Sequence, residues 1–561
     1  MSRDDWLMKS SISNITVVRA IYIVLLLTFF VCLTVQGFPN NKNNNFELIQ
    51  SDTINFNKTK KRIERLHNQG FITASFDSIF NDSGAVSTAF HKGEAYRWGN
   101  FLFNDSLKED LRALKKLQGK KVNLKRLESK LNSILLKKVS IGYPFFKLQL
   151  SPQVADNYII DCTVETDGYS SPVYIDTIVL PTKARISKGY ITNYLDIKEG
   201  NLYNHVILMS VEEKIEKLSF VELKTPLISR FSTQGAIIEL PIEAKMSGSF
   251  GGMLGFTTSE TDNKLQITGD ISLKLQNAFK RGESINLSWK SAANKSQTLL
   301  VKSELPYLFS SPFGLYANIN IQKKDTTLIN TDNEFSGIIH LKGLNQLRAG
   351  INYRTNSFLT STDTTLFDTK TVFYNGAYIF NNVDNWYNPS KGVEFEVNLK
   401  IGNRQKRDST MAKNAIYSLY SHCVKYWRLS ARNVLATSIE AGALKFKDKL
   451  WASELFKIGG MYSIRGFDEE AIFASEFILS TIEYRYRFEQ RSNAFVFFQF
   501  GGYKSESILR TTSSYLFSGG IGTMLNTGVG MFTVMYAMGK SKEQDLRLRT
   551  AKIHFGYVTR F

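Results

Sequence analysis

The sequence contains few cysteines and prolines and has no apolar run long enough for a membrane helix. Three cysteines in 561 residues exclude a disulfide scaffold, and ten prolines exclude collagen-like or proline-rich material. The most apolar segment, Ile21–Val35, is shorter than the ~20 residues that a transmembrane helix needs. A bundle of membrane helices is therefore excluded. A transmembrane β-barrel remains possible, because its strands alternate apolar and polar residues and its mean hydropathy resembles that of a soluble protein.

The composition is that of a folded, basic protein. The hydrophobic share of 43% and the aromatic share of 13% exclude a mainly disordered chain, and the length predicts several domains. The net charge of +19 raises the question of nucleic acid or an anionic membrane surface as a partner. The excess is spread along the chain, its densest stretch being residues 58–62. Because no nucleic-acid motif accompanies it, we expect no nucleic-acid partner.

The N-terminus has the pattern of an export signal. Basic residues precede the apolar run, and Val35 and Gly37 stand at positions −3 and −1 of a potential cleavage site before Phe38. We therefore predict a signal peptide at residues 1–37; an uncleaved anchor is the alternative. The two remaining cysteines are far apart in the sequence, so we assign no disulfide to them.

Residues 38–246 mix helical and strand periodicity and predict three small α/β modules, at 44–105 (degenerate), 106–171 and 172–246. The last module has the order strand, helix, helix, strand, strand. Its second helix carries one apolar stripe at 3-4-3 spacing, made by Leu208, Val211, Ile215 and Leu218. This order, with its Lys-x-Gly-x-x-Tyr segment from Lys198, resembles a POTRA domain. The resemblance implies a chaperone-like module whose edge strand accepts an extended client; the alternative is a structural spacer.

From Ser247 onward the period is two. In residues 265–275 every odd position is apolar or glycine and every even position is polar. About sixteen such segments follow one another between residues 247 and 561, and a soluble β-sandwich would have to sustain this alternation over the whole stretch. We predict a β-dominated membrane protein, in which small α/β modules precede a 16-stranded transmembrane antiparallel β-barrel at 247–561.

The last residues support a barrel. Phe555, Tyr557 and the terminal Phe561 fall on the same face of a final strand. This pattern resembles the C-terminal signal by which bacterial outer-membrane barrels are recognised for assembly. The alternative is an ordinary final strand.

One segment indicates the family. A long loop at about 446–474, between the eleventh and twelfth predicted strands, contains Ile464, Arg465, Gly466 and Phe467. The chain here resembles the superfamily of POTRA-plus-barrel proteins, the bacterial surface antigen family. It includes BamA and TamA, which assemble outer-membrane proteins, and the two-partner secretion transporters. The resemblance implies that the loop folds into the lumen and that Arg465 docks on the inner wall. A guanidinium stays charged and needs an acceptor there.

The resemblance also implies the acceptors. Glu483 and Arg485 match the family's Glu-x-Arg pattern in the twelfth strand, which makes Glu483 the stronger candidate. In the thirteenth strand, Gln499 and Gly501 stand in the family's Phe-x-Asp-x-Gly pattern, with Gln499 replacing the aspartate. A neutral amide accepts a hydrogen bond but not a charge-assisted one.

No catalytic or metal-binding motif is present, and we expect no enzyme activity, cofactor or metal. Our leading hypothesis is an outer-membrane assembly factor. It would bind unfolded outer-membrane proteins through its modules, in contact with outer-membrane lipid and with possible periplasmic or lipoprotein accessories. The client strands would be templated at the seam between the first and last barrel strands. Four glycines in the first strand suit an opening seam or, equally, a tight closure: Gly248, Gly251, Gly252 and Gly255. The first alternative is a secretion pore for one dedicated polypeptide, against which three modules and the lack of a clear plug helix argue. The second is a passive porin, against which the modules argue.

Overall fold

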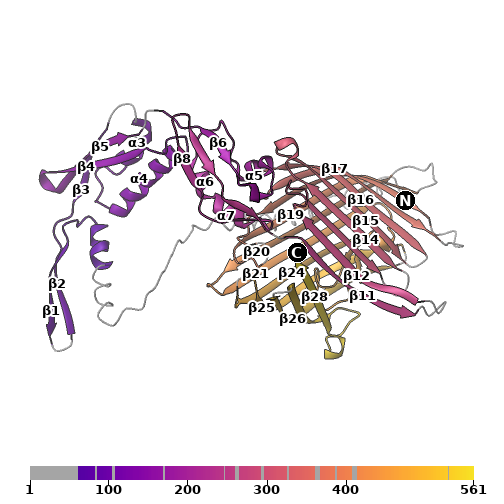
Figure 1. Cartoon of the computed structure of the whole chain (residues 1–561). Coiled ribbons are helices and arrows are strands. Elements are labelled where there is room, and N and C mark those ends of the chain that lie inside the picture. The colour runs from indigo at the N-terminus through magenta and orange to yellow at the C-terminus, as the bar shows by residue number, and fades with distance from the viewer. Residues whose placement is uncertain are drawn as a thin grey trace, which may run out of the picture.

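The computed structural model describes residues 61–560, apart from 83–84, 104–107, 169–170, 246, 259–264, 292–295, 325–326, 360–366, 386–387, 407–413, 490, 509 and 528–529. The predicted signal peptide and Phe561 lie outside the described residues. A large β-barrel carries small α/β modules at one of its ends (Figure 1). None of the helices in the described part of the chain has the length and apolar character that a membrane crossing requires.

Sixteen strands of the described chain form one closed antiparallel barrel, as predicted, and each strand pairs with its neighbour in the barrel order. They are β11 (Ser249–Thr258), β12 (Leu265–Gln276), β13 (Ser284–Ser291), β14 (Gln297–Leu305), β15 (Phe313–Lys324), β16 (Leu328–His340), β17 (Gln346–Phe358), β18 (Thr369–Asn381), β19 (Gly392–Lys406), β20 (Asn414–Arg428), β21 (Asn433–Phe446), β24 (Glu476–Arg487), β25 (Asn493–Glu506), β26 (Thr511–Thr527), β27 (Gly530–Lys540) and β28 (Lys552–Arg560).

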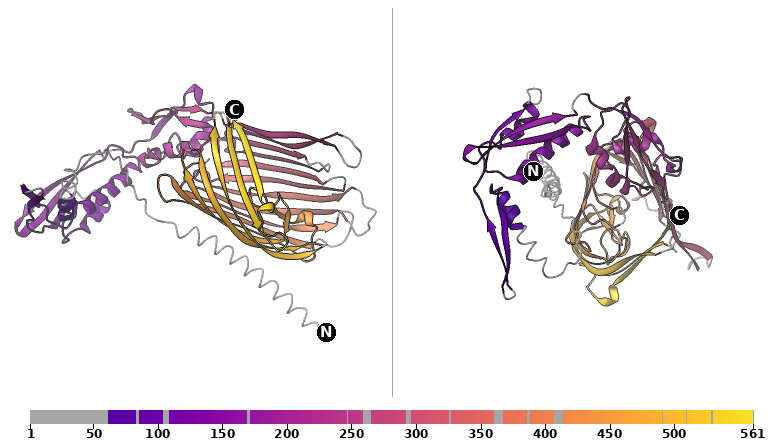
Figure 2. Two further views of the ribbon diagram at one scale, coloured as in Figure 1. Left: turned by 90° about the horizontal axis from the view of Figure 1, so that it is seen from below. Right: turned by 60° about the vertical axis from the view of Figure 1, so that its left-hand side comes forward.

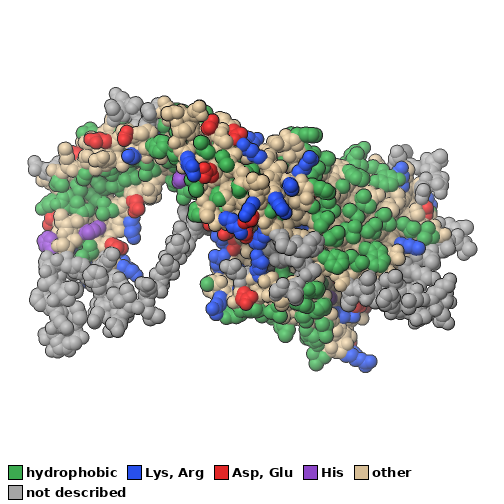
Figure 3. All heavy atoms as spheres, in the orientation of Figure 1, with side chains coloured by type: hydrophobic (Ala, Val, Ile, Leu, Met, Phe, Trp, Pro, Cys, Tyr) green, Lys and Arg blue, Asp and Glu red, His purple; other side chains and the backbone are tan. Residues whose placement is uncertain are grey.

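The alternation in the sequence places apolar side chains on the outer wall and polar ones in the lumen. Phe335 and Tyr374 are 59% and 67% exposed, whereas the next residues along their strands, Ser336 and Asn375, are buried in the lumen. Figure 3 shows apolar side chains gathered on the outer wall of the barrel. A wall that is apolar outside and polar inside is the surface that a transmembrane barrel presents to lipid and to water.

The seam between the first and last strands is short. Among the described residues, β11 and β28 pair at two positions, Ser249 with Arg560 and Phe250 with Thr559, whereas the pairing of β11 with β12 covers the whole of β11. Gly251 belongs to the close approach at this seam, because a Cβ there would lie 3.0 Å from the carbonyl oxygen of Tyr557. Far fewer residue pairs therefore join β11 to β28 than join β11 to β12.

Two sets of N-terminal elements share one topology. The first, here called the distal module, comprises β3 (Arg97–Phe103), α3 (Lys108–Lys115), α4 (Leu124–Val139), β4 (Lys147–Ala155) and β5 (Ile159–Asp167). The second, the proximal module, comprises β6 (Ile175–Val179), α5 (Lys188–Leu195), α6 (His205–Met209), α7 (Val211–Glu216), β7 (Val221–Leu223), β8 (Ile228–Phe231), β9 (Ala236–Glu239) and β10 (Ile242–Ala244). β3 pairs in parallel with β5, and β6 pairs in parallel with β9 in the same way. An edge strand, β4 or β8, pairs antiparallel to β5 or β9.

One helix in each module, α4 and α6, begins at an asparagine cap. Asn123 accepts a hydrogen bond from the backbone N–H of Arg126 at the start of α4, and Asn204 does the same for Ile207 at the start of α6. Such caps satisfy an N–H group that has no partner within the helix. The stripe predicted as one helix is split into α6 and α7 at Ser210, and Leu208, Val211, Ile215 and Leu218 are all buried in the core of the proximal module.

The interval 44–105 contains elements of different kinds. Residues 61–67 are helical, and Gly70, three positions beyond this helix, has φ +100°. The hairpin of β1 (Ser75–Asp82) and β2 (Ala85–His91) follows and projects from the end far from the barrel (Figure 1). β3 lies in the same interval but pairs with β5 of the distal module. The boundaries of the three modules therefore remain predictions.

The proximal module is docked on the turns at one end of the barrel, here called the module end; the opposite end is the loop end (Figure 2). In the turn between β12 and β13, the Lys280 carbonyl oxygen accepts a hydrogen bond from the Ser187 N–H at 2.7 Å. The carbonyl oxygen of Ser310, between β14 and β15, accepts one from Asn193 at 2.7 Å. The buried ring of Tyr307 belongs to the core of the module. Barrel and module therefore share one packed interface.

Candidate functional site in the barrel lumen

The longest connection between barrel strands, residues 447–475, leaves β21 at the loop end and folds into the lumen (Figure 2, right). Within it, β22 (Phe456–Ile458) and β23 (Ile472–Ala474) pair as a short hairpin, whose tip, residues 459–471, contains the predicted motif. We call residues 447–475 the inward loop. As predicted, it lies between the eleventh and twelfth strands of the barrel, β21 and β24.

Arg465 at the tip lies against the inner wall at Glu483 in β24. The Nη1 atom of Arg465 is 2.5 Å from Oε2 of Glu483, whose side chain is 6% exposed. Arg485, on the same strand, donates its Nε to the other oxygen of Glu483 at 2.6 Å. The guanidinium of Arg465 also lies 4.3 Å from the centroid of the Phe497 ring. Arg465 and Arg485 thus share one buried carboxylate, and each of the three charged groups has a partner of opposite sign.

Gln499 in β25 holds the backbone of the tip rather than the guanidinium. Its Oε1 accepts a hydrogen bond from the N–H of Arg465 at 2.8 Å. Its Nε2 donates to the carbonyl oxygen of Ser463 at 2.9 Å and to the hydroxyl of Thr481 at 3.0 Å. A glutamine therefore does here what a carboxylate cannot, because the side chain must donate and accept at the same time.

Gly466 and Phe467 fit the tip against β27. Gly466 has φ +82°, and a Cβ there would lie 2.6 Å from the backbone carbon of Met538. The carbonyl oxygen of Gly466 accepts a hydrogen bond from Gln544 at 3.0 Å. Phe467 is 4% exposed and packs against Gly539, where a Cβ would lie 2.7 Å from its ring. The close approach of loop and wall thus depends on glycine on both sides.

Ile464 supplies the apolar contact of the tip. It is fully buried in a cluster that joins loop residues Ile458 and Phe467 to wall residues Phe477, Leu479 and Leu516. Between the tip and the wall lies a cavity of about 150 Å³, whose lining includes His422, Glu440, Arg465 and Glu483. The tip is therefore held by packing and by hydrogen bonds together.

The remaining predicted residues lie elsewhere. Gly501 lies two residues beyond Gln499 in β25, and a Cβ there would lie 2.1 Å from the carbonyl oxygen of Ile478, so it serves the approach of β24 and β25. Phe555 and Tyr557 lie in β28, with Phe555 60% exposed and Tyr557 packed 4.5 Å from the ring of Phe532.

The turn that precedes the ninth strand is organised around Asp384. Burial by itself would raise the pKa of this carboxyl, but hydrogen bonds from the hydroxyl and N–H of Ser390 and the N–H of Lys391 hold it below its usual value. Arg428 donates to the same carboxylate at 2.6 Å. The Asn-Pro-Ser-Lys-Gly segment from Asn388 is thus fixed at the module end.

Sequence reasoning missed the base of the inward loop. Glu454 lies in a segment of the inward loop that has no sequence motif. Arg404 of β19 donates two hydrogen bonds of 2.8 Å to its carboxylate. Gln544 and His554, which approach Gly466, were missed as well. No local signal marks these residues, because each contact joins segments that are distant in the sequence.

The fold and the inward loop define a β-barrel membrane protein of the outer-membrane type, with POTRA-like modules at its N-terminal side. Residues 277–561, just over half of the chain, match the Omp85 superfamily domain. The chain belongs to the Omp85 superfamily, as the resemblance to the POTRA-plus-barrel proteins predicted.

Solved structures show the same fold at low sequence identity. CdiB from Acinetobacter baumannii is 13% identical with a TM-score of 0.51, and CdiB from Escherichia coli is 13% identical with a TM-score of 0.50. Each alignment covers 92% of this chain and 100% of the other. BamA from Haemophilus ducreyi lacking POTRA domains 1–3 is 14% identical, with a TM-score of 0.47 over 83% of this chain and 100% of that one. A comparison with curated proteins gives no significant match.

Proposed function

We propose that the chain inserts unfolded barrel proteins into the outer membrane, without enzymatic chemistry, by pairing client strands with the edges of its own seam. The observation that carries this proposal is that, within the described residues, β11 pairs with β28 at two positions only. Backbone groups exposed to lipid need hydrogen-bond partners. A seam that opens would offer two strand edges to a client and satisfy these groups one strand at a time.

The modules suit the capture of the client before insertion. β8 and β4 form edges of their sheets, and apolar side chains on them are exposed, Ile228 to 43% and Val154 to 67%. An extended segment adds to such an edge through backbone hydrogen bonds. We place the modules in the periplasm, because the longest connection, the inward loop, leaves from the opposite end of the barrel, and barrels carry their longer loops on the extracellular side.

A second candidate function is a secretion pore for one dedicated polypeptide. The described residues hold two modules with matching three-stranded sheets, which favours it, because the sequence argument against a pore rested on three modules and on the lack of a clear plug helix. In this function the client would pass through the lumen, and the inward loop would have to move.

A seam cross-link tests the leading proposal. In full-length protein reconstituted with an unfolded barrel client, a disulfide between Phe250→Cys and Thr559→Cys should abolish insertion, and a reductant should restore it. The matched control joins Asn286→Cys and Lys302→Cys, which pair between β13 and β14, and should insert normally. Normal insertion by the oxidised seam variant would refute the proposal. Depletion in the producing bacterium, followed by outer-membrane proteomics, separates assembly (loss of many barrels) from secretion (loss of one exported protein).

A further inference from the structure

The base of the inward loop is attached to the barrel wall at a buried ion pair that no sequence motif marks. The carboxylate of Glu454, 2% exposed, receives Nε and Nη2 of Arg404, each at 2.8 Å. It also accepts hydrogen bonds from the hydroxyl of Thr369 at 3.2 Å and from the N–H of Trp451 at 2.9 Å. Both carboxylate oxygens are therefore satisfied, in the paired geometry that makes Arg–carboxylate bonds strong.

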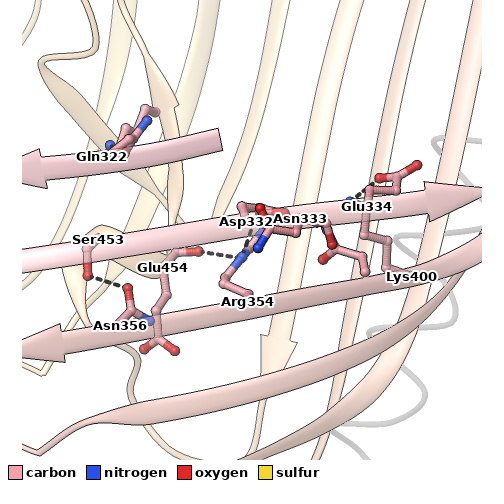
Figure 4. Close-up of polar contacts among 11 residues, drawn as sticks. Gln322, Asp332, Asn333, Glu334, Arg354, Asn356, Lys400, Ser453 and Glu454 are labelled. Atoms are coloured by element: carbon pink, nitrogen blue, oxygen red, sulfur yellow. Dashed lines mark hydrogen bonds and ion pairs between the residues drawn. The ribbon is translucent and has the colours of Figure 1, made fainter. Parts of the chain in front are cut away.

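Neighbouring strands extend this attachment (Figure 4). Arg354 of β17 donates to the carbonyl oxygen of Glu454 at 3.2 Å and is itself held by Asp332 of β16 at 2.7 Å. Ser453 donates its hydroxyl to Asn356 at 3.2 Å. The base thus makes polar contacts with β17, β18 and β19, the seventh to ninth strands of the barrel, and Asp332 of β16 supports it through Arg354.

Apolar packing accompanies the polar contacts. The ring of Trp451 lies 5.1 Å from that of Phe358 and 5.2 Å from that of Phe367. Leu450 and Leu455 are buried in a cluster with Phe373 of the wall. The base is therefore as deeply packed as the tip.

The base and the tip of the inward loop bind different strands of the barrel wall. The tip contacts Glu483 and Gln499 on the twelfth and thirteenth strands and packs against Gly539 on the fifteenth. Arg354, at the base, lies on the seventh strand, half of the ring away from the fifteenth. The side-chain hydrogen bonds of base and tip therefore lie on different strands, and Leu450 at the base also accepts a hydrogen bond from the N–H of Ile508, just beyond the thirteenth strand.

We propose that Glu454 and Arg404 form a second attachment, which keeps the inward loop inside the barrel when the tip leaves the wall. Arg465 is 18% exposed and shares its acceptor with Arg485, whereas Arg404 is 6% exposed and takes both oxygens of Glu454. The tip is thus the attachment that releases first, and the base is the pivot about which it moves. The inference goes beyond the proposed function, since it concerns where the loop lies and requires no client.

Disulfide trapping tests the proposal in the full chain, folded in detergent, with Cys162 and Cys423 replaced by alanine. The pair Ser453→Cys and Asn356→Cys reports on the base, and a spin label at Tyr462, which is 87% exposed, paired with one at Arg432 in the turn between β20 and β21, reports on the tip. Arg465→Ala should broaden the tip distances and leave the base disulfide yield within about twofold. Glu454→Gln should lower the base yield several-fold.

The matched control is Glu334→Gln. Glu334 is another buried carboxylate of the same wall, paired with Lys400 at 3.0 Å and bound by Asn375, and its replacement should leave the base yield unchanged. Heat-modifiable migration on gels verifies that each barrel is folded. Arg404→Lys, which keeps the charge but not the paired geometry, replaces Glu454→Gln if that variant fails to fold. The proposal is overturned if Arg465→Ala lowers the base yield as much as Glu454→Gln does, or if the variants at 454 and 404 leave it unchanged.

Discussion

Arg465 and Glu483 are 18 positions apart in the chain, and their side chains meet at 2.5 Å inside the barrel. Glu483 lies on β24, the strand that directly follows the inward loop in the sequence. The pair joins a tip that has no secondary structure of its own to a strand fixed on both sides by backbone pairing. Because Glu483 also binds Arg485, removal of Arg465 leaves the carboxylate with one counter-charge. The pair therefore positions the loop more than it stabilises the barrel.

The first prediction concerns this pair. Arg465→Ala should lower the stability of the barrel by about 1.5–3 kcal/mol, the range for a hydrogen bond to a charged group. It should lower insertion activity more than barrel abundance. A double-mutant cycle with Glu483→Gln should show a coupling of ~0.5–3 kcal/mol, since residues in contact are not additive. Heat-modified migration measures the stability and client insertion the activity. Strict additivity in both measurements would remove the pairing.

The second prediction uses the two-sided hydrogen bonding of Gln499. Gln499→Glu keeps the acceptor for the Arg465 N–H but turns the donor toward Ser463 into a carboxylate oxygen that faces a carbonyl oxygen. We expect a loss of about 1–3 kcal/mol in heat stability, the cost of an unsatisfied buried group. Gln499→Met, which removes both functions, is the comparison. Gln499→Glu as stable as the parent would show that Nε2 is not needed.

The third prediction is that Gly466→Ala displaces the tip from β27. Its Cβ would lie 2.6 Å from the Met538 backbone, so the variant must bear both backbone strain and overpacking, the latter typically ~1–3 kcal/mol. The matched control is Gly200→Ala, with φ +81° against +82° and no atom within 4 Å of its Cβ. Reactivity of a cysteine at Ser463, which lines the cavity between tip and wall, toward a soluble maleimide should rise in the first variant only. Equal reactivity in both variants would contradict the prediction.

The sequence predicted the barrel because its period of two is a local property, repeated in every strand. Strand number, the position of the inward loop and the facing of Glu483 toward the lumen follow from that period and from the motif at Arg465. Gln499 was expected as a weak acceptor for the guanidinium and instead binds the backbone. Which group Gln499 binds depends on how deeply the inward loop enters the lumen, and no local sequence pattern encodes that depth.

The modules and the base of the loop were harder to predict for the same reason. β3 belongs to the sheet of the distal module because it pairs in parallel with β5, across the intervening helices. Glu454 meets Arg404 across 50 residues. Both depend on which distant strands become neighbours, whereas hydrophobic periodicity reports only on the residues next to one another in a single element.

The fourth prediction concerns the interface between proximal module and barrel. Gly282, in the turn between β12 and β13, has φ +73°, and a Cβ there would lie 2.1 Å from the ring of Tyr190 in α5. Gly343, in the turn between β16 and β17 at the same end of the barrel, has φ +69° with no atom within 4 Å of its Cβ. Alanine at either position bears the same backbone strain, roughly 1–2 kcal/mol.

Only Gly282→Ala must also displace α5, whose residues Ser187 and Asn193 hold the turns of the barrel. We expect it to release the proximal module, which small-angle scattering of the full chain in detergent would show as a larger radius of gyration and limited proteolysis as faster cleavage near residue 246. Gly343→Ala should leave both measurements at the parent values, because its strain lies outside the interface. If the two variants behaved alike, the packing of Tyr190 against the turn would not be what holds the module. Another contact of the interface, Tyr190 against Tyr307 with ring centroids 5.2 Å apart, would be the next to test.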